Sequence, residues 1–132
     1  MYLLDSNVGI ALMRRTSTKV AEHFLKHRLS DVSTCSIVAA ELMAGAYLSQ
    51  ARERNLEITR DFLASMRQYP FDDACLEHYG ELRARLTRAG QFIGPNDLLI
   101  AATALAHGAI LVTHNTAEFS RVPGLLIEDW EA

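Results

Sequence analysis

The chain has 132 residues, of which 49% are hydrophobic and 22% are charged, and its formal net charge is −3. This balance is typical of one globular domain with a substantial core, residues 1–132, and it excludes an intrinsically disordered chain. The negative net charge excludes a globally basic nucleic-acid-binding protein, so any nucleic acid would have to be held by a local basic patch or by metal ions.

Short apolar runs alternate with helical patterns along the chain. In chain order, strands are expected at residues 2–4, 31–36, 68–71, 109–112 and 124–128. Helices are expected between them, at residues 8–13, 20–25, 37–50, 52–66, 72–89 and 95–107. Strands that alternate with helices predict a parallel sheet with helices on both faces. We therefore expect a three-layer α/β/α domain around a short, mainly parallel five-stranded sheet.

The first strand ends at an acidic residue. Asp5, Ser6 and Asn7 follow this strand, and all three are good N-cap residues for the next helix. In open α/β sheets, binding sites form outside the carboxyl ends of the strands, where the strand order reverses. Asp5 therefore belongs either to a site or only to a helix cap, and its position alone leaves both interpretations open.

Glu41 interrupts an apolar helical pattern. It shares one helical stripe with Ile37, Ala44 and Leu48. A carboxylate is almost never buried without a partner. We therefore interpret Glu41 as a functional side chain and not as a surface residue.

The segment from Ile93 to Phe119 has polar residues at both ends of a buried unit. Pro95 predicts the start of a helix, which places Asp97 in its first turn. Acids are also favoured in that turn by the helix dipole alone. Further polar side chains follow the next strand, and they are Thr113, Asn115 and Glu118.

Acids that converge at the polar edge of the sheet would repel one another unless a cation lay between them. Mg²⁺ and Mn²⁺ prefer oxygen ligands and are held by a few carboxylates together with substrate phosphates. No histidine pair in an acidic setting and no cysteine pair has the spacing of a zinc site, and the two cysteines are isolated, as expected in a reducing cytoplasm. The sequence therefore predicts a Mg²⁺ site, with Mn²⁺ as a substitute, formed by Asp5, Glu41 and Asp97.

Taken together, these motifs resemble one family. The chain resembles the PIN-domain ribonucleases of the VapC type, the toxic halves of bacterial type II toxin–antitoxin pairs. The matching segments follow in the expected order over nearly the whole chain: Leu3–Asn7, Ala40–Leu42, Gly45–Ala46, Ile93–Ala102, Leu111–Phe119, Arg121–Leu125 and Glu128–Trp130. The family usually has Asp-Thr-Asn where this chain has Asp5-Ser6-Asn7.

The resemblance implies a metal-dependent ribonuclease that cleaves RNA phosphodiester bonds and inhibits translation, with transfer RNA as a common substrate class. By resemblance, Asp5, Glu41 and Asp97 match the three acidic metal-site positions of the family. The broader family often has a fourth acid near the position of Asn115, and Glu118 is the candidate replacement. Supporting roles are implied for Ser6 and Asn7, expected to hydrogen bond to Asp5, and for Thr113 and Asn115.

The resemblance also implies partners. Family members are usually homodimers that a VapB-type antitoxin neutralises within a larger complex, and the apolar surfaces of residues 37–48 and 52–66 are expected docking faces. Arg14, Arg15, Lys19, Lys26 and Arg28 form either solvated helix faces or a basic patch, and two such patches brought together in a homodimer could supply a track for RNA. We expect a cytoplasmic protein without membrane association, because no apolar run approaches the roughly 20 residues that span a bilayer.

Two other functions remain open at this stage. Asp5 could be the nucleophile of a phosphohydrolase, although haloacid-dehalogenase-like enzymes need a second Asp where Asn7 stands. Alternatively, the chain could be a non-catalytic PIN fold that only binds RNA or a partner. An intact set of mutually repelling acids argues against that second alternative.

Overall fold

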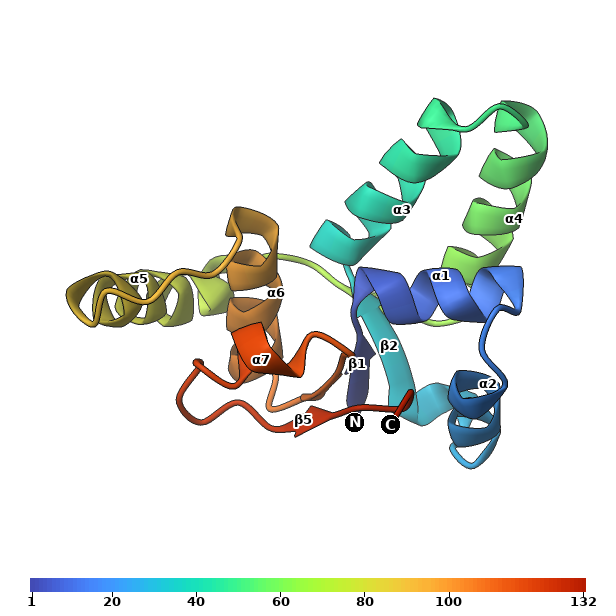
Figure 1. Cartoon of the computed structure of the whole chain (residues 1–132). Helices are drawn as coiled ribbons and strands as arrows, with labels where there is room; N and C mark the ends of the chain where they lie inside the picture. Colours follow the sequence, from blue (N-terminus) through green and yellow to red (C-terminus); the bar gives the residue numbers. More distant parts are fainter.

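A single five-stranded sheet forms the centre of the molecule in the computed structural model, which describes residues 1–132 (Figure 1). The strands are β1 (Tyr2–Leu4), β2 (Val32–Cys35), β3 (Arg67–Tyr69), β4 (Ile110–Val112) and β5 (Ile127–Glu128). The helices are α1 (Ser6–Arg14), α2 (Thr18–Leu25), α3 (Ser36–Leu48), α4 (Arg52–Ala64), α5 (Asp73–Arg88), α6 (Pro95–Ala106) and α7 (Thr116–Phe119). A 3-10 turn covers Leu29–Asp31. The expected fold class is confirmed.

All neighbouring strands are parallel, in the order β3-β2-β1-β4-β5. The central strand is β1, in which Tyr2 pairs with Val32 on one side and with Ile110 on the other. The chain adds β2 and β3 on one side of β1 before it returns to add β4 and β5 on the other. The strand order therefore reverses between β1 and β4, which is where sheets of this kind form their binding sites.

Successive residues of the central strands supply two separate cores. Leu3 and Leu111 pack on one face with side chains of α3, α5 and α6, whereas Leu4 and Val112 pack on the other face with side chains of α1 and α2 and with Trp130. The alternation follows from the strand geometry, in which neighbouring side chains point to opposite faces. Because helices cover both faces of the sheet, the sequences of β1 and β4 are apolar without interruption.

The hairpin of α3 and α4 extends away from the sheet (Figure 1). Val38 and Leu42, in the first half of α3, belong to the core on the sheet, whereas Ala46 is the only buried residue of its second half. At its far end Leu48 is 87% exposed. Glu41 lies on the half of α3 that is close to the sheet, so this helix can carry a functional side chain to the carboxyl ends of the strands.

Three local expectations are wrong, and the ends of the other elements differ from expectation by at most two residues, for example α4, which ends at Ala64 instead of Met66. The third strand ends at Tyr69 instead of Phe71, because Pro70 lacks the N–H that would continue the ladder. The last strand covers only Ile127–Glu128, because the chain first passes through Gly124 in the left-handed region (φ 79°). The inward face of α2 does not include Leu25, which is 80% exposed. No helix combines the length and the apolar character that a membrane crossing requires.

Candidate active site

The carboxyl ends of β1 and β4 lie side by side, and a polar residue follows each of them at once. Asp5 follows β1 and Thr113 follows β4. The backbone N–H of Asp5 donates to the carbonyl of Val112 (3.0 Å), which extends the ladder beyond the strands. The sheet itself therefore fixes these two side chains at the point where the strand order reverses.

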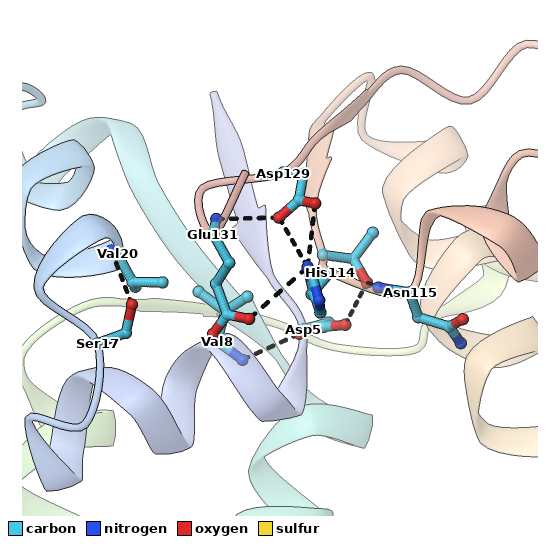
Figure 2. A network of polar contacts seen from close by, with 9 residues as sticks. Asp5, Val8, Ser17, Val20, His114, Asn115, Asp129 and Glu131 are labelled. Atoms are coloured by element: carbon cyan, nitrogen blue, oxygen red, sulfur yellow. Dashed lines mark hydrogen bonds and ion pairs between the residues drawn. The ribbon is translucent and has the colours of Figure 1, made fainter.

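Asp5 is held through both carboxylate oxygens. Its Oδ1 accepts the backbone N–H of Val8 (3.1 Å), so the side chain caps α1 (Figure 2). Its Oδ2 accepts the hydroxyl of Thr113 (2.5 Å). The residue is 6% exposed. Burial raises the pKa of Asp5 most, and the charge of Glu41 adds to this, while the hydrogen bonds from Thr113, Val8 and the Asn7 backbone oppose it. Asp5 therefore caps α1 and also lies in the candidate site, so the two interpretations of this residue are compatible.

Glu41 reaches the same place from α3. It is half-buried, and its Oε1 accepts the hydroxyl of Ser6 (2.6 Å). Ser6 therefore differs from expectation: its hydroxyl donates to Glu41 and not to Asp5. The reason is that Asp5 turns back to cap α1, while Ser6, the first residue of α1, faces α3, which packs against α1. The polar partner expected for Glu41 is present.

Asp97 lies in the first turn of α6, three residues after Gly94. Burial, followed by the charges of Glu118, Glu41 and Asp5 in that order, raises the pKa of Asp97 to about 6. An ordinary acid in the first turn of a helix has a lowered pKa, because the helix dipole favours its charged form. The opposite shift indicates that burial, together with the charges of the other carboxylates, outweighs the helix dipole at Asp97.

Glu118 is brought into the site by two hydrogen bonds. Its Oε1 accepts the backbone N–H of Gly94 (2.5 Å), and its Oε2 accepts the side-chain amide of Asn115 (2.9 Å). A hydrogen bond with Glu118 also contributes to the raised pKa of Asp97. The sequence alone places Glu118 only in a polar turn. In the structure it belongs to the short helix α7, and its side chain lies at the N-terminus of α6. The backbone donor at Gly94 has no signature in the sequence.

The four acids have no cationic partner in the chain. The only ion pairs in the structure join His114 to Asp129 and Glu131, and no Lys or Arg pairs with Asp5, Glu41, Asp97 or Glu118. Burial raises the pKa values of Asp5 and Asp97 most, and the uncompensated charges of the neighbouring acids raise them further. Every side-chain atom that could coordinate a metal ion here is a carboxylate, hydroxyl or amide oxygen. Such oxygen ligands fit a hard divalent cation and not a soft one.

The acids are nevertheless spread more widely than the ligands of one enclosed ion. The one set of three ligand atoms that lie within 4.8 Å of one another is elsewhere, in Asp72, Cys75 and His107. A spread arrangement suits Mg²⁺, which keeps several waters and takes only one or two protein carboxylates directly. The donor chemistry of the four acids, and not a preformed cage, is what fits Mg²⁺ here.

A second polar network borders the site. His114 contacts Asp129 through Nδ1 (3.0 Å) and lies 3.7 Å from Glu131, and both acids come from the C-terminal segment (Figure 2). The side chain of His114 is 63% exposed. It therefore lies at the rim, next to Thr113 in sequence, where an incoming ligand can reach it.

The chain is similar to known proteins over nearly its whole length. The family model described as PIN domain matches residues 2–125. The chain is 39% identical over 131 residues to the tRNA(fMet)-specific endonuclease VapC of Shigella flexneri, with 98% of this chain and 97% of that protein aligned. It is 37% identical over 132 residues to Ribonuclease VapC2 of Rickettsia felis, with 99% and 98% aligned.

Solved structures show the same likeness. The fold is similar to a DNA-bound VapBC structure from Salmonella typhimurium, with a TM-score of 0.92, 36% sequence identity, and 98% of this chain and 97% of that chain covered. Similarity at this level extends over the helices that carry the four acids as well as over the sheet.

Proposed function

The chain belongs to the PIN-domain family, as the resemblance in its motifs indicated, and we propose that it is the ribonuclease toxin of a type II toxin–antitoxin pair. It would cleave phosphodiester bonds of RNA in a reaction that depends on Mg²⁺ or Mn²⁺ and so inhibit translation. The observation that carries the proposal is the uncompensated cluster of carboxylates at the sheet's switch point, where burial and then charge repulsion raise the pKa of Asp97 to about 6.

We propose that Asp5, Glu41 and Asp97 hold the divalent cation. When bound, the cation would supply an activated water and charge stabilisation at the phosphate, which is the chemistry of metal-dependent nucleases. The chain itself orients the ligands: Thr113 and the N-terminus of α1 fix Asp5, and Ser6 fixes Glu41. Asn7 contributes its backbone N–H to Asp5. No side chain has to act as a covalent nucleophile.

Glu118 would take the place of the fourth acid of the family. Its contacts with Gly94 and Asn115 hold it beside Asp97, and Asn115 supports it in the way that Ser6 supports Glu41. In the metal-free protein, a proton on Asp97 would lower the repulsion between Asp97 and Glu118. A cation would replace that proton.

A groove leads from the site between α1, α3 and α4. It has a volume of about 310 Å³ and is lined by Glu41 at one end and by Arg14 and Arg54, among others. We propose that the RNA backbone follows these two arginines toward the acids, because guanidinium groups bind phosphate oxygens in a bidentate manner. Of the five basic residues expected to hold RNA, Arg14 is the one that lines this groove.

Transfer RNA is the proposed substrate class, since one relative is named a tRNA(fMet)-specific endonuclease. The test is to incubate the purified chain with total bacterial RNA and Mg²⁺ and to sequence the new 5′ ends. Ends confined to discrete positions in transfer RNA are expected. Ends found only in messenger or ribosomal RNA would overturn the substrate class while leaving the ribonuclease assignment intact.

The proposed protein partner is a VapB-type antitoxin, because the structural neighbours include VapBC complexes. A mainly apolar groove of about 640 Å³ between α1, α2 and the end of α4 suits an apolar antitoxin segment. Exposed Leu25 and Leu29 line it together with Phe24 and Met66. A homodimer, a larger complex with the antitoxin and a cytoplasmic location stay predictions.

The phosphohydrolase alternative finds little support in the residues near Asp5. The hydrogen bonds to both oxygens of Asp5 do not decide the question, because each oxygen keeps a second lone pair for a metal ion or a phosphate. The position two residues later is Asn7, which cannot act as the general acid of such an enzyme. A non-catalytic binding module is distinguished by the RNA-end experiment, because such a module would produce no new ends.

A further inference from the structure

A second set of metal-ligating side chains lies away from the four acids. Asp72 and Cys75 come from the start of α5, and His107 directly follows the end of α6. One ligand atom from each of the three lies within 4.8 Å of the other two. Figure 1 shows α5 beside α6, and these two helices pack closely together. Their packing brings together residues that are up to 35 positions apart in the sequence, 72 and 107.

The spacing of the two helix-start ligands matches a zinc ion. The Cys75 Sγ and the Asp72 Oδ1 are 3.5 Å apart. A thiolate about 2.3 Å and a carboxylate oxygen about 2.0 Å from one tetrahedral zinc ion lie about 3.5 Å apart. One sulfur, one imidazole nitrogen and one carboxylate oxygen form a donor set that favours zinc over Mg²⁺.

The side chains of Asp72 and His107 each lack a hydrogen bond that their position in the fold would normally provide. Asp72 is the N-cap residue of α5, yet its side chain makes no capping hydrogen bond and reaches toward Cys75 instead. The Nε2 atom of His107 is buried and has no hydrogen-bond partner. Buried polar atoms are rarely left unpaired, because the lost hydrogen bond with water costs free energy. A metal ion would use both groups.

The third ligand is shielded from solvent. Cys75 is fully buried, and its Sγ makes long contacts to Asp72 (3.5 Å) and to the Pro70 carbonyl (3.9 Å). The exposed Asp72 leaves one side of the cluster accessible to water. Three protein ligands with one open position are typical of zinc sites that also bind a water molecule.

We propose that Asp72, Cys75 and His107 bind one zinc ion that joins the start of α5 to the end of α6. The site is separate from the carboxylate site, because Asp97 and His107 lie ten residues apart along α6, or about 15 Å. It does not depend on the ribonuclease assignment. Its consequence is a chain that gains stability from two chemically different metals at opposite ends of the same helix.

The test uses Co²⁺ as a spectroscopic substitute for zinc, in the full chain carrying Asp97→Asn to weaken the carboxylate site. A thiolate-to-cobalt charge-transfer band in the near ultraviolet is expected to saturate at one equivalent and to disappear when Zn²⁺ is added. A large excess of Mg²⁺ should not remove it, because Mg²⁺ does not take thiolate ligands. No band in the folded chain would overturn the proposal.

Two thiol variants identify the ligand. Cys75→Ser should abolish the band, whereas Cys35→Ser, the matched change at the other buried cysteine, should keep it. If circular dichroism shows that Cys75→Ser is unfolded, Asp72→Asn decides, because Asp72 is exposed and makes no cap bond. It should weaken Co²⁺ binding at least about tenfold. Unchanged affinity in Asp72→Asn, or a band that survives in Cys75→Ser, would refute the site.

Discussion

Replacing Asp97 by Asn should stabilise the metal-free protein, although it removes a proposed metal ligand. The pKa of Asp97 is raised from 3.8 to about 6, so at neutral pH the charged form costs free energy in the folded state. Two pKa units correspond to about 3 kcal/mol at most. Because the side chain is partly exposed, solvent screening reduces this to about 1.5 kcal/mol.

One opposing effect must be subtracted. An acid in the first turn of a helix gains about 0.5 kcal/mol from the helix dipole, and Asn loses it. The net expectation is that Asp97→Asn raises the free energy of unfolding by about 1 kcal/mol at pH 7.5, or Tm by about 4 °C. Asp73→Asn is the matched control, because Asp73 is an exposed acid in the first turn of α5, where only the dipole contribution is lost.

The assay is urea unfolding of both variants in a chelator at pH 7.5 and at pH 4. A raised folded-state pKa means that the native state binds more protons than the unfolded state between about pH 4 and 6. Stability from this residue therefore falls as the pH rises through that window. The gain of Asp97→Asn should be present at pH 7.5 and absent at pH 4. A variant as destabilised as Asp73→Asn at pH 7.5 would refute the repulsion argument.

Four further outcomes are expected. Thr113→Val should destabilise the fold by about 1–3 kcal/mol in urea titration and should reduce cleavage, because it leaves an oxygen of buried Asp5 without its hydrogen bond. Unchanged stability would contradict the role of this hydrogen bond. Glu118→Gln should lower the pKa of Asp97, measured by carboxyl carbon NMR titration, and an unshifted pKa would show that the two groups do not interact. Arg54→Gln should raise KM for RNA with little change in kcat and should reduce the salt dependence of binding, whereas a loss in kcat alone would exclude a purely binding role. Leu25→Glu should weaken neutralisation by the antitoxin without loss of cleavage, and full neutralisation would move the docking site elsewhere.

Much of the fold could be predicted because its determinants are local. Apolar runs that end at Asp5 and at Thr113 give strands followed by polar caps, and Pro95 gives the start of α6. The parallel sheet and the switch-point location follow from this alternation. These are properties of short segments, so they can be inferred without knowing how the segments pack.

The details of the site depend on packing and could not be predicted. Ser6 was expected to serve Asp5, but the approach of α3 to α1 gives its hydroxyl to Glu41. Glu118 could not be placed until the backbone of Gly94 supplied a donor 24 residues away in the sequence. The cluster of Cys75 and His107 has no zinc-type spacing, because its members come from two helices that meet only in the folded chain.

The central claim is that the carboxylates converge to bind the cation on which RNA cleavage depends. Isothermal titration of Mn²⁺ tests it most directly when wild type, Asp97→Asn and Asp73→Asn are compared, each loaded with no more than one equivalent of Zn²⁺ so that the cysteine site is occupied and the carboxylate site stays free. The account predicts binding with wild type and Asp73→Asn, and at least about tenfold weaker binding with Asp97→Asn, accompanied by loss of RNA cleavage. Unimpaired Mn²⁺ binding and cleavage by Asp97→Asn would contradict it.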